Sequence, residues 1–259
     1  MTTPTPQVPA DRVSPPPSPP SAPRYDPRHR GLRVVGATVA GLLTLGLAVG
    51  TVPEMVRDSQ TQSFTLPEGT RELRIVGDAG DVDLRGVAAG VPTGISAEKH
   101  WSFREPHARA ETSDGVTTLT MDCPGFPALG QCYADWDVAV PEDLTVVVRT
   151  SVGDVDAAGL TGDVVVRSSV GGVKVAGAPS SLDVTTSVGD VEAVLTSPAE
   201  RLVARSAVGD VRVTLPGDVA YDLRTTGMDP ADVRVETSST SDYEVVLNSG
   251  VGSIVVTAG

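Results

Sequence analysis

Beyond residue 140, apolar residues recur at every second position, and one short motif interrupts them at regular intervals. The pentapeptide SVGDV stands at residues 151–155 and 187–191, and close variants occupy residues 169–173 and 207–211. The four motif glycines are separated by 18, 18 and 20 residues: Gly153, Gly171, Gly189 and Gly209. A period near 20 residues is typical of a repeat architecture.

Counting outward from each glycine places the apolar residues in columns of one parity, the pattern of strands with one buried face. Before the glycine the columns are Val146, Val164, Leu182, Leu202; Val148, Val166, Val184, Ala204; and Val152, Val170, Val188, Val208. After it they are Val155, Val173, Val191, Val211; and Ala157, Val175, Ala193, Val213. A column of small hydroxyl residues has the same parity: Thr150, Ser168, Thr186 and Ser206. All of these columns are predicted to face inward, with the hydroxyl groups bonded to one another or to nearby backbone.

The same register extends over a longer part of the chain. Residues 196–201, TSPAER, add two residues to one repeat, and an insertion of two leaves the inward face unchanged. Looser copies begin at Leu73 and Val245, and a weaker copy begins at Tyr221. The repeat is therefore predicted to frame the chain from residue 73 to residue 259.

Each motif is predicted to be a structural corner. Favoured two-residue hairpin turns need a positive φ at the first central residue, a poor position for Val152, whereas a corner between two strands asks only glycine for an unusual conformation. Aspartate is expected to bind local backbone N–H groups, as it does in turns. The predicted corner residues are Gly80, Asp81, Gly153, Asp154, Gly171, Gly189, Asp190, Gly209, Asp210 and Gly252.

These features predict an all-β fold, a parallel, β-helix-like solenoid with two short strands in each rung of about 18 to 20 residues. An antiparallel sandwich is the alternative. SVGDV does not match a phosphate-binding loop, because it has few glycines and no Lys-Ser/Thr sequel.

The N-terminal region has a different composition. Ten of the 21 prolines lie in the first 27 residues, so residues 1–33 are predicted to be a disordered, Pro-rich cytoplasmic tail. Residues 34–52 carry no charge over 19 residues, and at ~1.5 Å rise per residue they would span roughly 28 Å as one transmembrane helix. Residues 53–72 are a linker and first strand entry, and residues 73–259 the repeat domain, with an irregular disulfide-loop insertion at about residues 95–140.

Flanking charge predicts the orientation of the helix. Four arginines precede it, at positions 24, 28, 30 and 33, whereas Glu54, Arg57 and Asp58 follow it. The positive-inside rule then predicts a single-pass signal anchor in the cell membrane, with a cytoplasmic N-terminus and an extracytoplasmic repeat domain. Ala48 and Gly50 leave cleavage as a signal peptide open as the alternative.

Charge and cysteine content agree with an exported domain. Beyond the tail the chain has 15 basic and 31 acidic residues, a formal charge of −16, so nucleic acid is not expected as a partner. Cys123 and Cys132 enclose a short loop rich in proline and glycine, and they are predicted to form a disulfide in an oxidising compartment.

Candidate chemistry is sparse. His100 and His107 lie outside the regular repeat without a nucleophile motif, and they are interpreted as surface or packing residues. Asp190 and Asp210 would be neighbours if rungs stack ~4.8 Å apart, which resembles a retaining glycosidase pair or a calcium position. The repeat explains both aspartates without catalysis. No catalytic residue, cofactor or metal is therefore expected, and Trp101 and Trp136 are expected to pack over the end of the array.

Repeated S-x-G-D-V units behind a single N-terminal span resemble a β-strand-repeat family of bacterial envelope proteins of unknown function, often labelled putative adhesins. The resemblance covers roughly residues 60–259. It implies a right-handed, β-helix-like fold and an envelope location, and it brings no defined catalytic residues.

These observations predict a non-enzymatic, membrane-anchored surface module of the cell envelope. It would be adhesin-like or structural, and its ligand an envelope protein or polysaccharide. The first alternative is an envelope sensor whose Pro-rich tail docks a cytoplasmic partner. The second is a carbohydrate-active β-helix enzyme.

Overall fold

The computed structural model describes residues 58–123 and 131–259, which are strands and connecting turns throughout. The predicted Pro-rich tail and transmembrane helix lie outside the described residues. Within the described ranges, no helix is long and apolar enough to cross a membrane. The all-β prediction is confirmed for this part of the chain.

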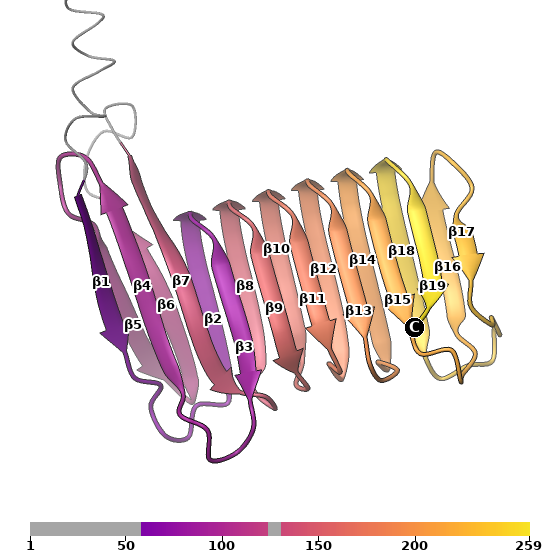
Figure 1. Ribbon diagram of the computed structural model, residues 1–259, viewed down its shortest axis with the longest axis horizontal. Helices are drawn as coiled ribbons and strands as arrows, with labels where there is room; N and C mark the ends of the chain where they lie inside the picture. Colours follow the sequence, from indigo (N-terminus) through magenta and orange to yellow (C-terminus); the bar gives the residue numbers. More distant parts are fainter. Residues whose placement is uncertain (1–57, 124–130) are drawn as a thin grey trace, which may run out of the picture. The chain divides into compact units, whose positions relative to one another are not determined.

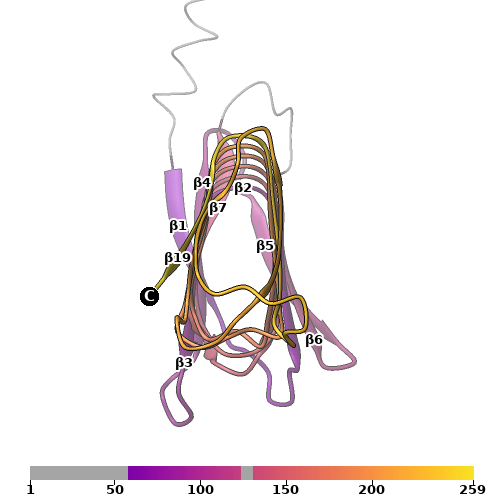
Figure 2. The ribbon, with the colours of Figure 1, turned by 90° about the vertical axis from the view of Figure 1, so that its right-hand side faces the viewer.

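The strands form two sheets that face one another across a common core (Figures 1 and 2). Sheet A contains, in spatial order, β1 (Asp58–Phe64), β4 (Gly94–Trp101), β7 (Cys132–Pro141), β3 (Val82–Val87), β9 (Val155–Leu160), β11 (Val173–Gly177), β13 (Val191–Leu195), β15 (Val211–Leu215), β19 (Ile254–Ala258) and β17 (Asp232–Arg234). Sheet B contains β16 (Asp222–Gly227), β18 (Glu244–Val251), β14 (Arg201–Val208), β12 (Ser181–Val188), β10 (Val164–Val170), β8 (Thr145–Val152), β2 (Glu72–Ala79), β6 (Val116–Asp122) and β5 (His107–Ser113).

Each regular rung is one strand of sheet B, a corner, and one strand of sheet A. Neighbouring rungs pair in parallel and in register, so that Val166 on β10 lies beside Val148 on β8 and Val184 on β12. The two extra residues of TSPAER fall outside the paired strands, and Leu182 still pairs with Leu202. The parallel pairing favours the solenoid over the antiparallel sandwich for these rungs.

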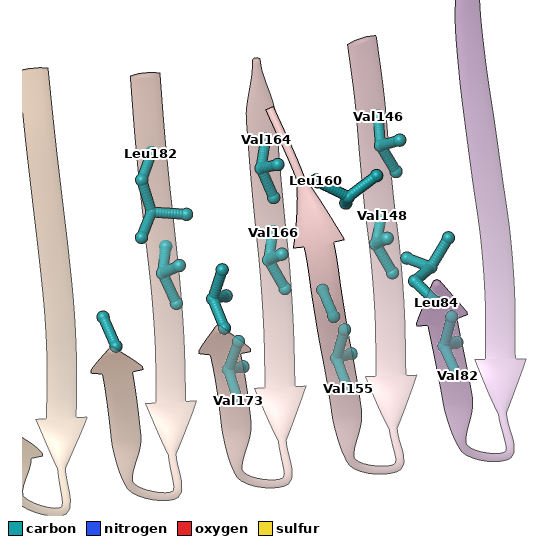
Figure 3. Close-up of a cluster of buried hydrophobic side chains, with 14 of the residues drawn as sticks. Val82, Leu84, Val146, Val148, Val155, Leu160, Val164, Val166, Val173 and Leu182 are labelled. Atoms are coloured by element: carbon teal, nitrogen blue, oxygen red, sulfur yellow. The ribbon is translucent and has the colours of Figure 1, made fainter. Parts of the chain in front are cut away.

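The core fills the space between the sheets with the predicted columns. Val146, Val148, Val164 and Val166 point inward from sheet B, and Val155 and Val173 point inward from sheet A (Figure 3). All six are at most 2% exposed. Branched side chains stacked in register exclude water along the length of the rungs, which makes their burial the main stabilising contribution.

One predicted inward column lies on the outside. Val152, Val170, Val188 and Val208 are 53%, 46%, 47% and 48% exposed, so their inward placement was wrong. The alternation of buried and exposed residues ends before Val152. The last two residues of the strand, Ser151 and Val152, are both exposed. The chain has begun to cross between the sheets there, and the hydroxyl column and the stacked glycines occupy the inner side of the bend.

The rungs do not stack in chain order at either end of the array. The first rung, β2–β3, lies between β6–β7 and β8–β9, and the last rung, β18–β19, lies between β14–β15 and β16–β17. The first rung is therefore covered by strands that follow it in the sequence, whereas the last rung is covered by strands that precede it.

The N-terminal end is more regular than the sequence suggested. The predicted irregular insertion at about residues 95–140 supplies β4 to β7, and the predicted linker contains β1. Three pairings at this end are antiparallel, β1 with β4, β4 with β7 and β5 with β6. Strands β4 and β7 cover the core with Ile95, Ala97 and Trp136, all at most 3% exposed.

Candidate functional site: the glycine–aspartate corner and the outer face

The corner glycines are required by close backbone approach. Gly153, Gly171, Gly189 and Gly209 have φ between 142° and 147°, a region that side chains strongly disfavour. A Cβ atom on Gly171 would lie 2.0 Å from the carbonyl oxygen of Gly153 in the rung before it, and a Cβ on Gly189 would meet Gly171 in the same way. The corners thus stack backbone on backbone, which only glycine permits.

Two kinds of hydrogen bond join neighbouring corners. The backbone N–H of Gly153 donates to the carbonyl oxygen of Val170 at 2.9 Å, and later corners repeat this bond. In the opposite direction, the carboxylate of each corner aspartate accepts the backbone N–H of the corner residue one rung further on. The distances from Oδ1 to the nitrogen are 2.8 Å for Asp81 and Asp154, 2.7 Å for Asp154 and Gly172, 2.8 Å for Asp190 and Asp210, and 2.8 Å for Asp210 and Ser253.

We call this series of carboxylate bonds the corner clasp. The sequence predicted that aspartate would bind local N–H groups, but the partner lies in the adjacent rung, 18 residues away for Asp154. Asp135 on β7 extends the clasp by accepting the N–H of Asp81 at 2.9 Å. The aspartates therefore stabilise the stacking of rungs rather than the turn alone, because a charged acceptor strengthens a bond between separate parts of the chain.

The clasp is interrupted once, at Gly172. Among the described residues, no carboxylate accepts the N–H of Asp190, since Gly172 takes the place of aspartate in the rung before it. A Cβ on Gly172 would have ordinary contacts, the nearest at 3.6 Å to Asp154 Oδ1. There is room for a side chain at this position.

Replacing Gly172 with Asn should stabilise the protein. The amide oxygen would accept the free N–H of Asp190 without adding a charge beside Asp154, and the unfolded chain would lose glycine's freedom. We expect the free energy of unfolding to rise by about 0.5–1.5 kcal/mol. Chemical denaturation of the Gly172→Asn variant beside the wild type measures this, and a lowered midpoint would contradict the inferred geometry of the gap.

The clasp also predicts a pH dependence at its C-terminal end. The pKa of Asp210 is lowered because its carboxylate accepts the Ser253 backbone N–H, with a smaller contribution from Arg212. A carboxyl group whose pKa is lower in the folded than in the unfolded protein stabilises the fold. Its full contribution is present above the unfolded pKa of about 3.9 and is lost as the pH falls through the pKa of the folded protein. The wild type should therefore lose more stability than Asp210→Asn between pH 7 and about pH 3. Urea midpoints at the two pH values measure the difference, and equal losses would count against the bond.

The hydroxyl column lies behind the corners, as predicted. Ser206 and Ser249 each donate to the carbonyl oxygen of the preceding corner glycine at 2.8 Å, and Thr186 donates to Gly171 at 3.2 Å. Ser168 Oγ is buried and has no hydrogen-bond partner among the described residues. The column therefore supplies donors to corner carbonyls.

Asp190 and Asp210 are neighbours, as the stacking of rungs predicted, but both are engaged in the clasp. Arg212 lies between them, bonded to the Asp210 carboxylate and 3.5 Å from Asp190 Oδ2. A retaining glycosidase needs one carboxyl with a raised pKa to donate a proton. The lowered pKa of Asp210 suits a structural acceptor instead. Within the described ranges, no group of three or more His, Cys, Asp or Glu side chains is arranged to hold a metal ion.

The remaining candidate residues lie at the N-terminal end. His100 stacks on Tyr133 with ring centroids 4.6 Å apart, and its Nε2 lies 3.5 Å from Asp135. Trp136 is 3% exposed and packs near Phe64, whereas Trp101 is half-buried, with the Lys99 ammonium 5.9 Å from its ring. A disulfide joins Cys123 to Cys132.

The outer face of sheet A carries an acidic patch that the sequence analysis did not single out. Asp137, Asp83 and Asp156 lie side by side on β7, β3 and β9, and the clasp residues Asp135, Asp81 and Asp154 lie two positions before them. Arg85 is paired with Asp137 at 2.6 Å and with Asp83 at 3.6 Å. The sequence does contain a pattern that indicates this patch, because GDVD occurs at residues 80–83 and 153–156. Alternate positions of a strand lie on the same face, so the two aspartates of each GDVD can face outward together.

The fold and corners define the class of protein, a repeat of two-strand rungs stacked in register. A family model described as Toastrack DUF4097 matches residues 47–258, and the chain belongs to this family. Two solved structures are similar to parts of it. One is a putative cell adhesion protein from Clostridium sporogenes, 15% identical, covering 78% of this chain and 100% of its own, with a TM-score of 0.49. The other is a putative adhesin from Bacteroides fragilis, 13% identical, covering 77% and 97%, with a TM-score of 0.39. No curated protein matches the chain.

Proposed function

We propose that the chain is a non-enzymatic surface module of the cell envelope, which binds an envelope protein or polysaccharide through the outer faces of its stacked rungs. The observation that carries this proposal is the clasped corner. Backbone bonds fix every regular rung to the next, and carboxylate bonds add to them at every corner except the gap at Gly172, so outward side chains of consecutive strands stand in constant register. A rigid surface of this kind supports binding because few groups need to be ordered on association.

The outward side chains also suit recognition better than catalysis. Sheet B carries ion pairs such as Arg167 with Asp183 at 2.7 Å, while sheet A carries the acidic patch. Asp190 and Asp210, the pair considered for a glycosidase or calcium site, are both used by the clasp. Binding by fixed polar and charged columns is therefore the proposed activity.

The envelope location is proposed from the sequence. Residues 34–52 would anchor the chain in the cell membrane as a single span, and the arginines before it would keep the N-terminus in the cytoplasm. Protease added to intact, wall-stripped cells should then digest the repeat domain and spare the tail. A repeat domain protected inside the cell, or mature protein that begins near Thr51 in the culture fluid, would overturn the anchored arrangement.

Binding can be tested on cells of a non-adherent bacterial host that produce the full chain. Their retention on immobilised envelope polysaccharide and envelope protein fractions is compared with that of the host alone. We expect retention that is lost in a variant whose array is unfolded, such as Val166→Asp. Retention equal to the host, or release of new reducing ends from the polysaccharide, would contradict a non-enzymatic binding module.

A further inference from the structure

The interior of the array changes character at its N-terminal end. In the regular rungs the inward positions are aliphatic or hydroxyl side chains, as Figure 3 shows for Val148 and Val166. On β1 and β4 the positions in register with this face are Gln60, Gln62 and Lys99, because Gln60 pairs with Lys99 and Gln62 with the buried Ala97; Gln60 is exposed, Gln62 half-buried and Lys99 buried. Long polar side chains therefore line the end of the core.

These side chains border a cavity of about 550 Å³ between the edge strands of the two sheets. Strand β1 supplies residues 60–62, β4 supplies Lys99, and Glu105 and residues 107–109 complete the lining. Only one hydrogen bond crosses the gap, from Gln62 Nε2 to the Ala108 carbonyl oxygen at 3.3 Å, among the described contacts of β1 with β5. The volume lies in the range of small-molecule sites.

Lys99 is the unusual group in this cavity. It is 3% exposed, and its ammonium donates to Glu105 Oε1 at 2.7 Å. This bond lowers the pKa of Glu105. An ammonium has three N–H donors, and Glu105 is its one hydrogen-bond acceptor among the described residues. A buried cation with open donors favours an anionic acceptor, since water competes poorly there.

The other lining groups restrict the ligand further. Arg109 also lines the opening, and its guanidinium is paired with Asp122 at 2.9 Å. Gln60 has no partner among the described side chains, and its amide can donate and accept at once, as can the hydroxyl groups of a sugar. One carboxylate beside Lys99 and several hydroxyls beside the glutamines would satisfy this arrangement.

We propose that this end cavity binds a sugar that carries a carboxylate, of the uronic acid class. The carboxylate would accept the remaining N–H donors of Lys99, and the ring hydroxyls would bond to Gln60 and Gln62. The cavity would then be the point at which the proposed surface module contacts an acidic polysaccharide, so the proposal rests on that function while naming its ligand class.

The test titrates D-glucuronate into the purified full-length chain in detergent at physiological salt, followed by calorimetry, with D-glucose and acetate as separate probes. We expect D-glucuronate to bind more tightly than both, because D-glucose lacks the carboxylate and acetate lacks the ring hydroxyls. Lys99→Met should weaken binding by about tenfold or more, and Gln60→Leu by several-fold. The matched control is Lys174→Met, an exposed lysine on β11 outside the cavity, which should change nothing.

The outcomes separate the two proposals. Three results would overturn the cavity site. These are equal affinity for D-glucose and D-glucuronate, no binding of D-glucuronate, and D-glucuronate binding that is unchanged in both Lys99→Met and Gln60→Leu. Circular dichroism shows whether each variant is folded. If Lys99→Met fails to fold, Gln60→Leu still tests the site, because Gln60 lies on an exposed edge strand. Cells that adhere normally with a Gln60→Leu variant that has lost D-glucuronate binding would refute the cavity as the point of contact but leave the surface-module function intact. Binding of D-glucuronate by a chain that gives no cell retention would refute the function and leave the site.

Discussion

Replacing Val166 with Asp should unfold the array. Val166 on β10 is fully buried between the sheets, with Val148 and Val184 as register partners on either side. The carboxylate would have no partner there, and either ionisation or protonation in an apolar column is unfavourable. We expect a loss of about 4 kcal/mol or more, seen as the loss of a cooperative thermal transition.

The same strand provides the matched control. Val170 is 46% exposed at the end of β10, so Val170→Asp makes the same chemical change in water. Its effect should stay within about 1 kcal/mol. The sequence columns alone would have placed both residues inside and predicted equal damage. Unchanged melting of Val166→Asp, or equal losses in the two variants, would contradict the observed faces of the strand.

Replacing Gly171 with Ala should be almost as damaging, although it adds one methyl group. Its φ of 142° is unfavourable for alanine, and the new Cβ would lie 2.0 Å from the Gly153 carbonyl oxygen. Relief requires the two corners to separate, which would lengthen the Gly153-to-Val170 bond and the clasp bond of Asp154 to Gly172. We expect a loss of about 2–5 kcal/mol in chemical denaturation.

The neighbouring glycine is the control for this prediction. Gly172 has no positive φ, and its Cβ would meet nothing closer than 3.6 Å. Gly172→Ala should therefore be neutral or slightly stabilising, through the unfolded state alone. A Gly171→Ala variant as stable as Gly172→Ala would show that the corners do not stack as closely as described.

The strand columns could be predicted because period two and a constant repeat length are local properties of the sequence. Leu73, Val146, Val164, Leu182, Leu202 and Val245 form one continuous register across six rungs. The two-residue insertion at 196–201 kept that register, since an even insertion preserves the side-chain face. The failure at Val152 has the opposite cause, because periodicity does not report where a strand leaves its sheet.

Long-range placement could not be predicted from the pattern. The order of rungs at the two ends depends on which strand edges remain free after folding. The sequence around Leu73 and around Val245 does not indicate which strand will pair with each free edge. The partner of Asp154 was likewise assigned to its own turn, although it lies on the next rung. Nothing in the sequence singled out Lys99, because its burial follows from antiparallel pairing within a segment that was predicted to be irregular.

Backbone hydrogen exchange at the corners, resolved by residue with NMR spectroscopy, tests most directly whether rungs are clasped to one another through the aspartates. The N–H groups of Asp154, Gly172 and Asp210 are each accepted by the carboxylate of the rung before, whereas the N–H of Asp190 faces the gap at Gly172. The clasp predicts slow exchange at the first three and fast exchange at Asp190. Uniform exchange at all four positions would contradict it.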